Sequence, residues 1–93
     1  MPEQGGAQLS VTVVRTGGIV GGRREWAASG PREEWLPLVE ACPWRSIPAD
    51  LASRDRFVYV ITVRGRRRRK AQVPEVALTG PWRELVERVQ QAG

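Results

Sequence analysis

The sequence contains no histidine and only one cysteine, Cys42. A single thiol cannot close an internal disulfide, and without imidazole the chain has no ordinary zinc ligand set. Acid–base catalysis by histidine is excluded for the same reason. Apolar runs are too short for a transmembrane helix, and the first residues lack the basic and apolar regions of a secretory signal. We therefore expect a cytoplasmic protein with no cofactor, no metal and no membrane partner.

Lysine is also scarce, since Lys70 is the only one among 15 basic residues, and the net charge is +5. Six of the basic residues lie in Arg64–Lys70, and the rest of the chain carries nine basic and ten acidic residues. A basic hairpin of this kind can bind nucleic-acid phosphates, or it can be a solvated edge strand. Consecutive cations on a strand point to both faces, and no aromatic residue interleaves to stack on bases. We expect any nucleic-acid binding by this hairpin to be weak and non-specific.

The length of 93 residues, with 41% hydrophobic residues, predicts one globular domain. Alternating apolar residues predict strands, and Pro31 and Pro81 stand where helices are expected to begin. The predicted fold is α+β, a single ββαββα domain whose antiparallel four-stranded sheet carries two helices on one face. The predicted boundaries are a disordered tail over 1–8, a domain over 9–91, strands over 9–15, 23–28, 55–64 and 66–73, and helices from 31 and 81.

The predicted core combines one stripe of each helix with one face of each strand, which holds Leu9, Val11, Val13, Trp26, Phe57, Tyr59, Ile61 and Val63. The stripes follow the i, i+3, i+4, i+7 spacing of an amphipathic helix: Trp35, Leu38, Val39 and Cys42 in the first, and Trp82, Leu85, Val86 and Val89 in the second. Pro37 interrupts the first pattern, so that helix is expected to begin near Glu34 or to kink. Cys42 is interpreted as a buried structural thiol rather than a nucleophile. No pair of carboxylates has a spacing that indicates catalysis, and we expect no enzyme.

A glycine-rich segment, Thr16–Gly22, joins the first two predicted strands. It lacks the Lys-Ser/Thr of a phosphate-binding P-loop and leads into a strand rather than a helix. Its centre holds Ile19 and Val20, where a simple turn would carry Asn-Gly or Asp-Gly. Exposed apolar residues on a narrow, glycine-flanked projection are typical of a segment that enters a cleft.

These residues together resemble the emfourin family, small intracellular bacterial proteins that inhibit protealysin-like metalloproteases of the thermolysin type. The resemblance covers residues 9–91, nearly the whole chain. It rests on three motifs in this order: R-x-G-G-x-x-G at Arg15–Gly21, D-R-x-x-Y at Asp55–Tyr59 and V-P-E at Val73–Glu75. Each motif alone is weak, and the specificity comes from their combination.

The resemblance implies a monomeric inhibitor that occludes the active-site cleft of a zinc metalloprotease without itself binding metal. The residues expected to contact the protease are Arg15, Thr16, Gly17, Gly18, Ile19, Val20 and Gly21, with a secondary contact from Arg66, Arg67, Arg69 and Trp44. Nucleic-acid binding through the Arg64–Lys70 hairpin is the alternative function. A third hypothesis is an interaction or dimerisation domain that uses a free sheet edge.

Overall fold

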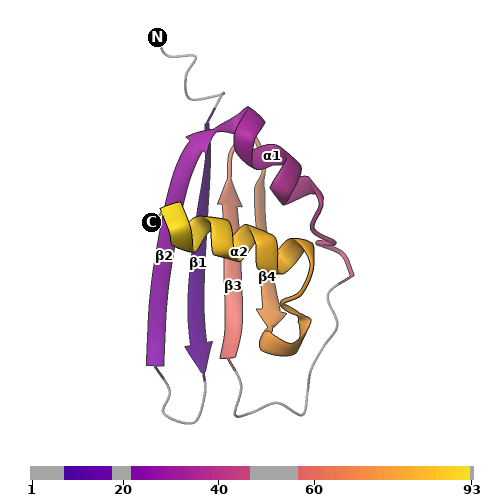
Figure 1. Cartoon of the computed structure of the whole chain (residues 1–93). Coiled ribbons are helices and arrows are strands. Elements are labelled where there is room, and N and C mark those ends of the chain that lie inside the picture. The colour runs from indigo at the N-terminus through magenta and orange to yellow at the C-terminus, as the bar shows by residue number, and fades with distance from the viewer. Residues whose placement is uncertain (1–7, 18–21, 47–56, 93) are drawn as a thin grey trace.

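The computed structural model describes residues 8–17, 22–46 and 57–92, which form one antiparallel sheet and two α-helices. The strand order is β2-β1-β3-β4, and both helices cover the same face of the sheet (Figure 1). This confirms the predicted α+β fold and its ββαββα order. The elements are β1 (Gln8–Gly17), β2 (Gly22–Pro31), α1 (Arg32–Glu40), β3 (Phe57–Arg64), β4 (Arg68–Pro74), a 3-10 helix η2 (Glu75–Ala77) and α2 (Pro81–Ala92).

The core lies between the sheet and the two helices. In the centre of the sheet Val13 is paired with Trp26 on one side and with Ile61 on the other. Because side chains alternate between the two faces of a strand, every second residue of each strand lies beneath the helices. The predicted stripe of α2 is buried, as are most of the predicted strand positions: Leu9, Val11, Val13, Tyr59, Ile61, Val63, Trp82, Leu85, Val86 and Val89.

The bounds of strands β1, β2 and β4 differ from the predicted ones. Gln8, which the sequence placed in a disordered tail, is the first residue of β1 and pairs with Pro31. β2 therefore continues to Pro31, which caps α1 instead of lying inside it, because the long pairing with β1 holds this segment extended. β4 begins at Arg68, since Gly65–Arg67 form the turn. Residues 1–7, 55 and 56 lie outside the described residues.

Helix α1 is shorter and less regular than its sequence pattern suggests. It begins at Arg32 and continues through Pro37 instead of starting near Glu34. The carbonyl that Pro37 leaves unbonded belongs to Glu33, which is exposed and can bond to water. Trp35 is buried, whereas Leu38 is half-buried and packs against the core, so the predicted stripe is only partly buried at that position. The short helix rests on the end of the sheet and cannot bury a full stripe.

Gly30 is the point at which β2 and α1 come closest. A Cβ atom on Gly30 would lie 2.7 Å from Nε1 of the buried Trp35. We expect Gly30→Ala to lower the free energy of unfolding by about 1–3 kcal/mol, because the indole must move within a packed core. Gly22→Ala in the same strand is the matched control, since its Cβ would meet no atom within 4 Å. Urea unfolding of the two variants tests this, and equal stability would contradict the packing described.

Candidate functional site

The predicted protease-binding segment begins at the end of β1. Thr16 pairs with Arg23, and Gly17 pairs with both Gly22 and Phe57. Gly17 has a φ of 100°, a conformation that favours glycine. Gly18, Ile19, Val20 and Gly21 lie outside the described residues. The two ends of this four-residue connection are therefore fixed side by side in the sheet.

A cation–aromatic cluster stands beside this hairpin end. The Arg15 guanidinium carbon lies 4.3 Å from the ring centroid of Phe57 and 5.7 Å from that of Trp26. Arg24 approaches the same indole at 5.2 Å. Both aromatic rings are half-buried, and contacts of this kind contribute about 0.5–1 kcal/mol each at exposed sites. The cluster packs beside Thr16 and Gly17, the last two residues of β1.

The sequence identified Arg15 as a site residue but assigned Trp26 and Phe57 to the core alone. Both rings do pack against the core, yet each also contacts the Arg15 guanidinium. Alternation within β2 places Arg24 and Trp26 on one face, and the pairing of Arg15 with Arg24 brings Arg15 to that face. The pairing of β1 with β3, which brings Phe57 to the same place, has no local sequence signal.

The basic run is divided between the two faces of β4, as its sequence predicts. Arg68 pairs with Arg64, and Lys70 pairs with Thr62, so these side chains share the face that the helices leave open. Arg69 pairs with the buried Val63 and therefore lies on the helix-covered face. β4 is an edge strand, so its charges also oppose pairing with another chain.

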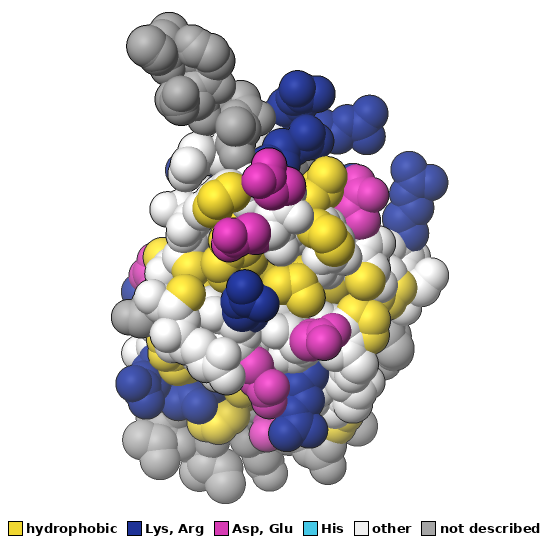
Figure 2. Space-filling model, turned by 45° about the horizontal axis from the view of Figure 1, so that its top comes forward, with side chains coloured by type: hydrophobic (Ala, Val, Ile, Leu, Met, Phe, Trp, Pro, Cys, Tyr) yellow, Lys and Arg dark blue, Asp and Glu magenta, His cyan; other side chains and the backbone are white. Residues whose placement is uncertain are grey.

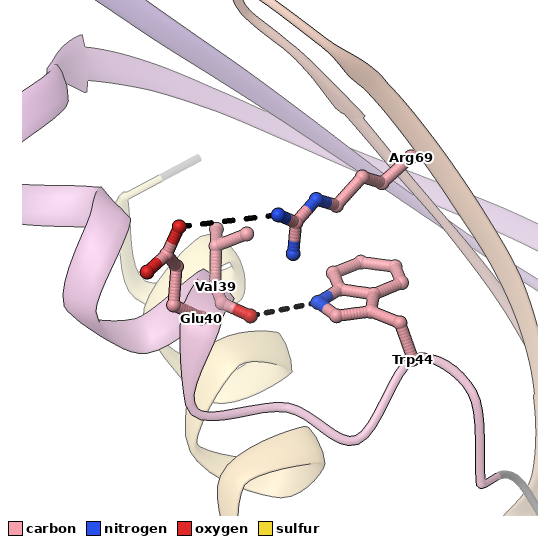
Figure 3. A network of polar contacts seen from close by, with 4 residues as sticks. All are labelled: Val39, Glu40, Trp44 and Arg69. Atoms are coloured by element: carbon pink, nitrogen blue, oxygen red, sulfur yellow. Dashed lines mark hydrogen bonds and ion pairs between the residues drawn. The ribbon is translucent and has the colours of Figure 1, made fainter.

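Trp44 has a structural role in the segment that follows α1. Its indole Nε1 donates a hydrogen bond to the Val39 carbonyl at 2.7 Å, and its ring meets Trp82 edge-on with centroids 4.8 Å apart. Arg69 extends from β4 over this ring at 5.9 Å and reaches within 3.9 Å of the Glu40 carboxylate (Figure 3). Trp44 is half-buried, and these contacts tie the end of α1 to α2 and β4.

The predicted protease-binding residues and the arginines of the predicted secondary contact lie at opposite ends of the sheet. Gly17 pairs with Phe57 at one end, whereas Ser10 pairs with Arg64 at the other, next to the turn that carries Arg66. β1 separates these ends by about 23 Å at roughly 3.3 Å per residue. Figure 2 shows basic side chains gathered at the end that carries α1 and a second group at the opposite end. The structure thus separates the residues predicted for the primary contact from the arginines predicted for the secondary one.

A pocket of about 480 Å³ lies between α1 and the β3–β4 turn. Its residues come from β1, α1, β3, the β3–β4 turn and the start of β4, and they combine an apolar floor with a basic rim. The floor is formed by Leu9, Leu36, Val39 and Val63, and the rim by Arg32, Arg66, Arg67 and Arg69 with Glu40. Sequence reasoning missed Arg32, because only the packing of α1 against the sheet brings it to the other arginines.

Cys42 is a buried thiol and not an activated nucleophile. Its Sγ donates to the Leu38 carbonyl at 3.3 Å. Burial raises the pKa of this thiol to about 11, and the negative charge of Glu84 acts in the same direction. The thiolate, which is the reactive form, is therefore suppressed at neutral pH.

Within residues 8–17, 22–46 and 57–92, no three acidic, cysteine or histidine side chains are grouped so as to hold a metal ion. No helix in the same part of the chain has the length and apolar character needed to cross a membrane.

Comparison of the chain with models of protein families, with curated proteins and with solved structures finds no match.

Proposed function

We propose that this protein is an inhibitor of a thermolysin-type, protealysin-like zinc metalloprotease in the cytoplasm, and that it acts as a monomer. In this proposal the segment Thr16–Gly22 occludes the active-site cleft. The observation that carries it is the pairing of β1 with β2 up to Gly17 and Gly22, which fixes both ends of an apolar, glycine-flanked connection. The motif resemblance to emfourins supports the same assignment.

A short connection with fixed ends suits an inhibitor for an energetic reason. Binding orders the groups at an interface, and the entropy lost reduces the affinity unless the free protein is already organised. The sheet and the Arg15 cluster provide that organisation at the ends of the connection. Thermolysin-type proteases prefer a bulky aliphatic residue just after the scissile bond, so Ile19 or Val20 would fill that pocket. The flanking glycines would allow the backbone to approach the zinc without the alignment needed for cleavage.

The direct test is an inhibition assay with a purified protealysin-like metalloprotease and a peptide substrate. We expect the added protein to suppress peptidase activity in competition with the substrate, and the chain to remain intact by mass spectrometry. Full activity in the presence of a large excess of the protein, or rapid cleavage of the Thr16–Gly22 segment, would contradict the proposal.

Nucleic-acid binding through Arg64–Lys70 has less support. Arg68 and Lys70 share one face of β4, whereas Arg69 lies on the other and is held near Glu40 and Trp44. A duplex that contacts one face reaches only part of the run. Because the affinity of such binding grows with the number of phosphates contacted, this division favours weak, salt-sensitive binding.

A further inference from the structure

We propose that the pocket between α1 and the β3–β4 turn binds a small organic phosphate monoester. The rim arginines would hold the phosphate, and the apolar floor would contact the organic part. The pocket lies at the end of the sheet opposite to Gly17 and Gly22, so this proposal does not depend on protease inhibition.

The charge of the pocket favours a dianion. Four guanidinium groups line it against one carboxylate, that of Glu40, which lies 3.9 Å from Arg69. Among the described residues, Arg32, Arg66 and Arg67 form no ion pair. A carboxylate ligand supplies one negative charge, whereas a phosphate monoester supplies about 1.5–2 at pH 7. Guanidinium forks also match the oxygens of phosphate by paired hydrogen bonds.

Arg32 has a donor that lacks an acceptor. Its Nε is buried and has no hydrogen-bond partner in the part of the chain that the structure describes. A buried donor left unpaired costs free energy, so binding gains if Arg32 turns its guanidinium toward an anion in the pocket. Arg32 is also the first residue of the nine-residue helix α1, whose dipole is positive at that end. The opposite rim is organised as well, because Arg69 is held by Glu40 and by the face of Trp44.

The floor of the pocket predicts that the ligand has an apolar part. The half-buried Leu36 presents the accessible apolar surface, whereas Val39, Val63 and Leu9, which are 2%, 2% and 4% exposed, close the pocket from beneath. A volume of about 480 Å³ falls within the roughly 300–1,000 Å³ of small-molecule sites and exceeds what a phosphate ion fills. A phosphodiester of a nucleic acid carries one charge and two flanking sugars, so it matches this hollow less well than a monoester does.

The contribution of the phosphate charge and that of the apolar contacts can be measured separately. The experiment is calorimetric titration of the full chain with phenyl phosphate, inorganic phosphate and benzoate. We expect phenyl phosphate to bind most tightly, because it alone combines the dianion with an apolar ring. Each of the other probes should bind at least about fivefold more weakly, having lost either the ring contacts or the second charge. Absence of phenyl phosphate binding at about 10 mM, well above the 1 mM dissociation constant of a weak ligand, overturns the proposal, as does equal affinity for all three probes.

Two variants, Arg32→Gln and Arg67→Gln, test whether phenyl phosphate binds in the pocket. Each is expected to weaken phenyl phosphate binding about tenfold, the typical loss when a charge-assisted hydrogen bond is removed, with an unchanged thermal melt. Arg64→Gln is the matched control, since Arg64 is exposed and lies on the open face next to the same turn. If the control weakens binding as much as the rim variants, the effect is diffuse charge and the pocket assignment is wrong.

Two further measurements complete the test. A DNA duplex should not displace phenyl phosphate at equal phosphate concentration. Displacement would identify nucleic acid as the source of the phosphate and overturn the small-molecule assignment.

Saturating phenyl phosphate should leave inhibition of the protealysin-like protease unchanged. A loss of inhibition would show that the two sites are not independent, contrary to the separation proposed here.

Discussion

Leu85→Asp is expected to unfold the protein. Leu85 lies in the middle of the α2 stripe, is 0% exposed and is surrounded by the buried strands beneath it. An unpaired carboxylate at this position would lose its hydration without gaining a partner, which costs several kcal/mol. A domain of this size has a total stability of only about 5–15 kcal/mol. Circular dichroism and thermal melting should show loss of the cooperative transition.

Two other variants calibrate this result. Leu38→Asp should cost clearly less, because Leu38 is half-buried and its carboxylate can reach water. Gln91→Asp, at an exposed position of α2, should stay within about 0.5 kcal/mol of the parent. If Leu85→Asp melts like Gln91→Asp, the face of α2 that packs on the sheet has been placed wrongly.

The parts of this fold that the sequence predicts are those whose pattern lies within a single helix or strand. The stripe from Trp82 to Val89 predicts the buried face of α2, since four apolar residues at helical spacing have one common side. The alternation in β1 and β3 predicts their inward faces in the same way. At Leu38 the period predicts the side that packs on the core but not the degree of burial, which depends on where α1 rests on the sheet.

The two candidate sites differ in the same way: one lies within a single segment, and the other is formed only by packing. The glycine-rich segment is visible in the sequence because its composition departs from that of an ordinary turn. The pocket is not visible, since Arg32 and Arg67 are 35 positions apart in the chain and only the packing of α1 on the sheet unites them. Trp44 illustrates the reverse case, because its sequence neighbours indicate a loop while its contacts with Val39 and Trp82 make it part of the packing.

Ile19→Asp is expected to weaken inhibition of a protealysin-like protease by well over tenfold. A bulky aliphatic side chain that fills the primed-side pocket contributes about 1.5–3 kcal/mol, and a carboxylate would instead be desolvated there without a partner. Gly18→Val should cause similar damage by excluding the backbone from the zinc edge. Both variants should melt like the parent, because they leave the buried core between the sheet and the helices unchanged. The inhibition constant and the thermal melt are measured for each variant.

The double variant Arg67→Glu/Arg69→Glu is the control at the other end of the sheet. These arginines lie near the β3–β4 turn, at the opposite end of the sheet from Gly17. The proposed cleft contact therefore does not include them. The double variant should therefore inhibit like the parent, apart from a modest, salt-dependent change in the association rate as the net charge falls. If the variants at 18 and 19 inhibit normally while the arginine variant fails, the contact surface is the basic turn. In that case Arg67 and its neighbours, and not the glycine-rich connection, bind the protease.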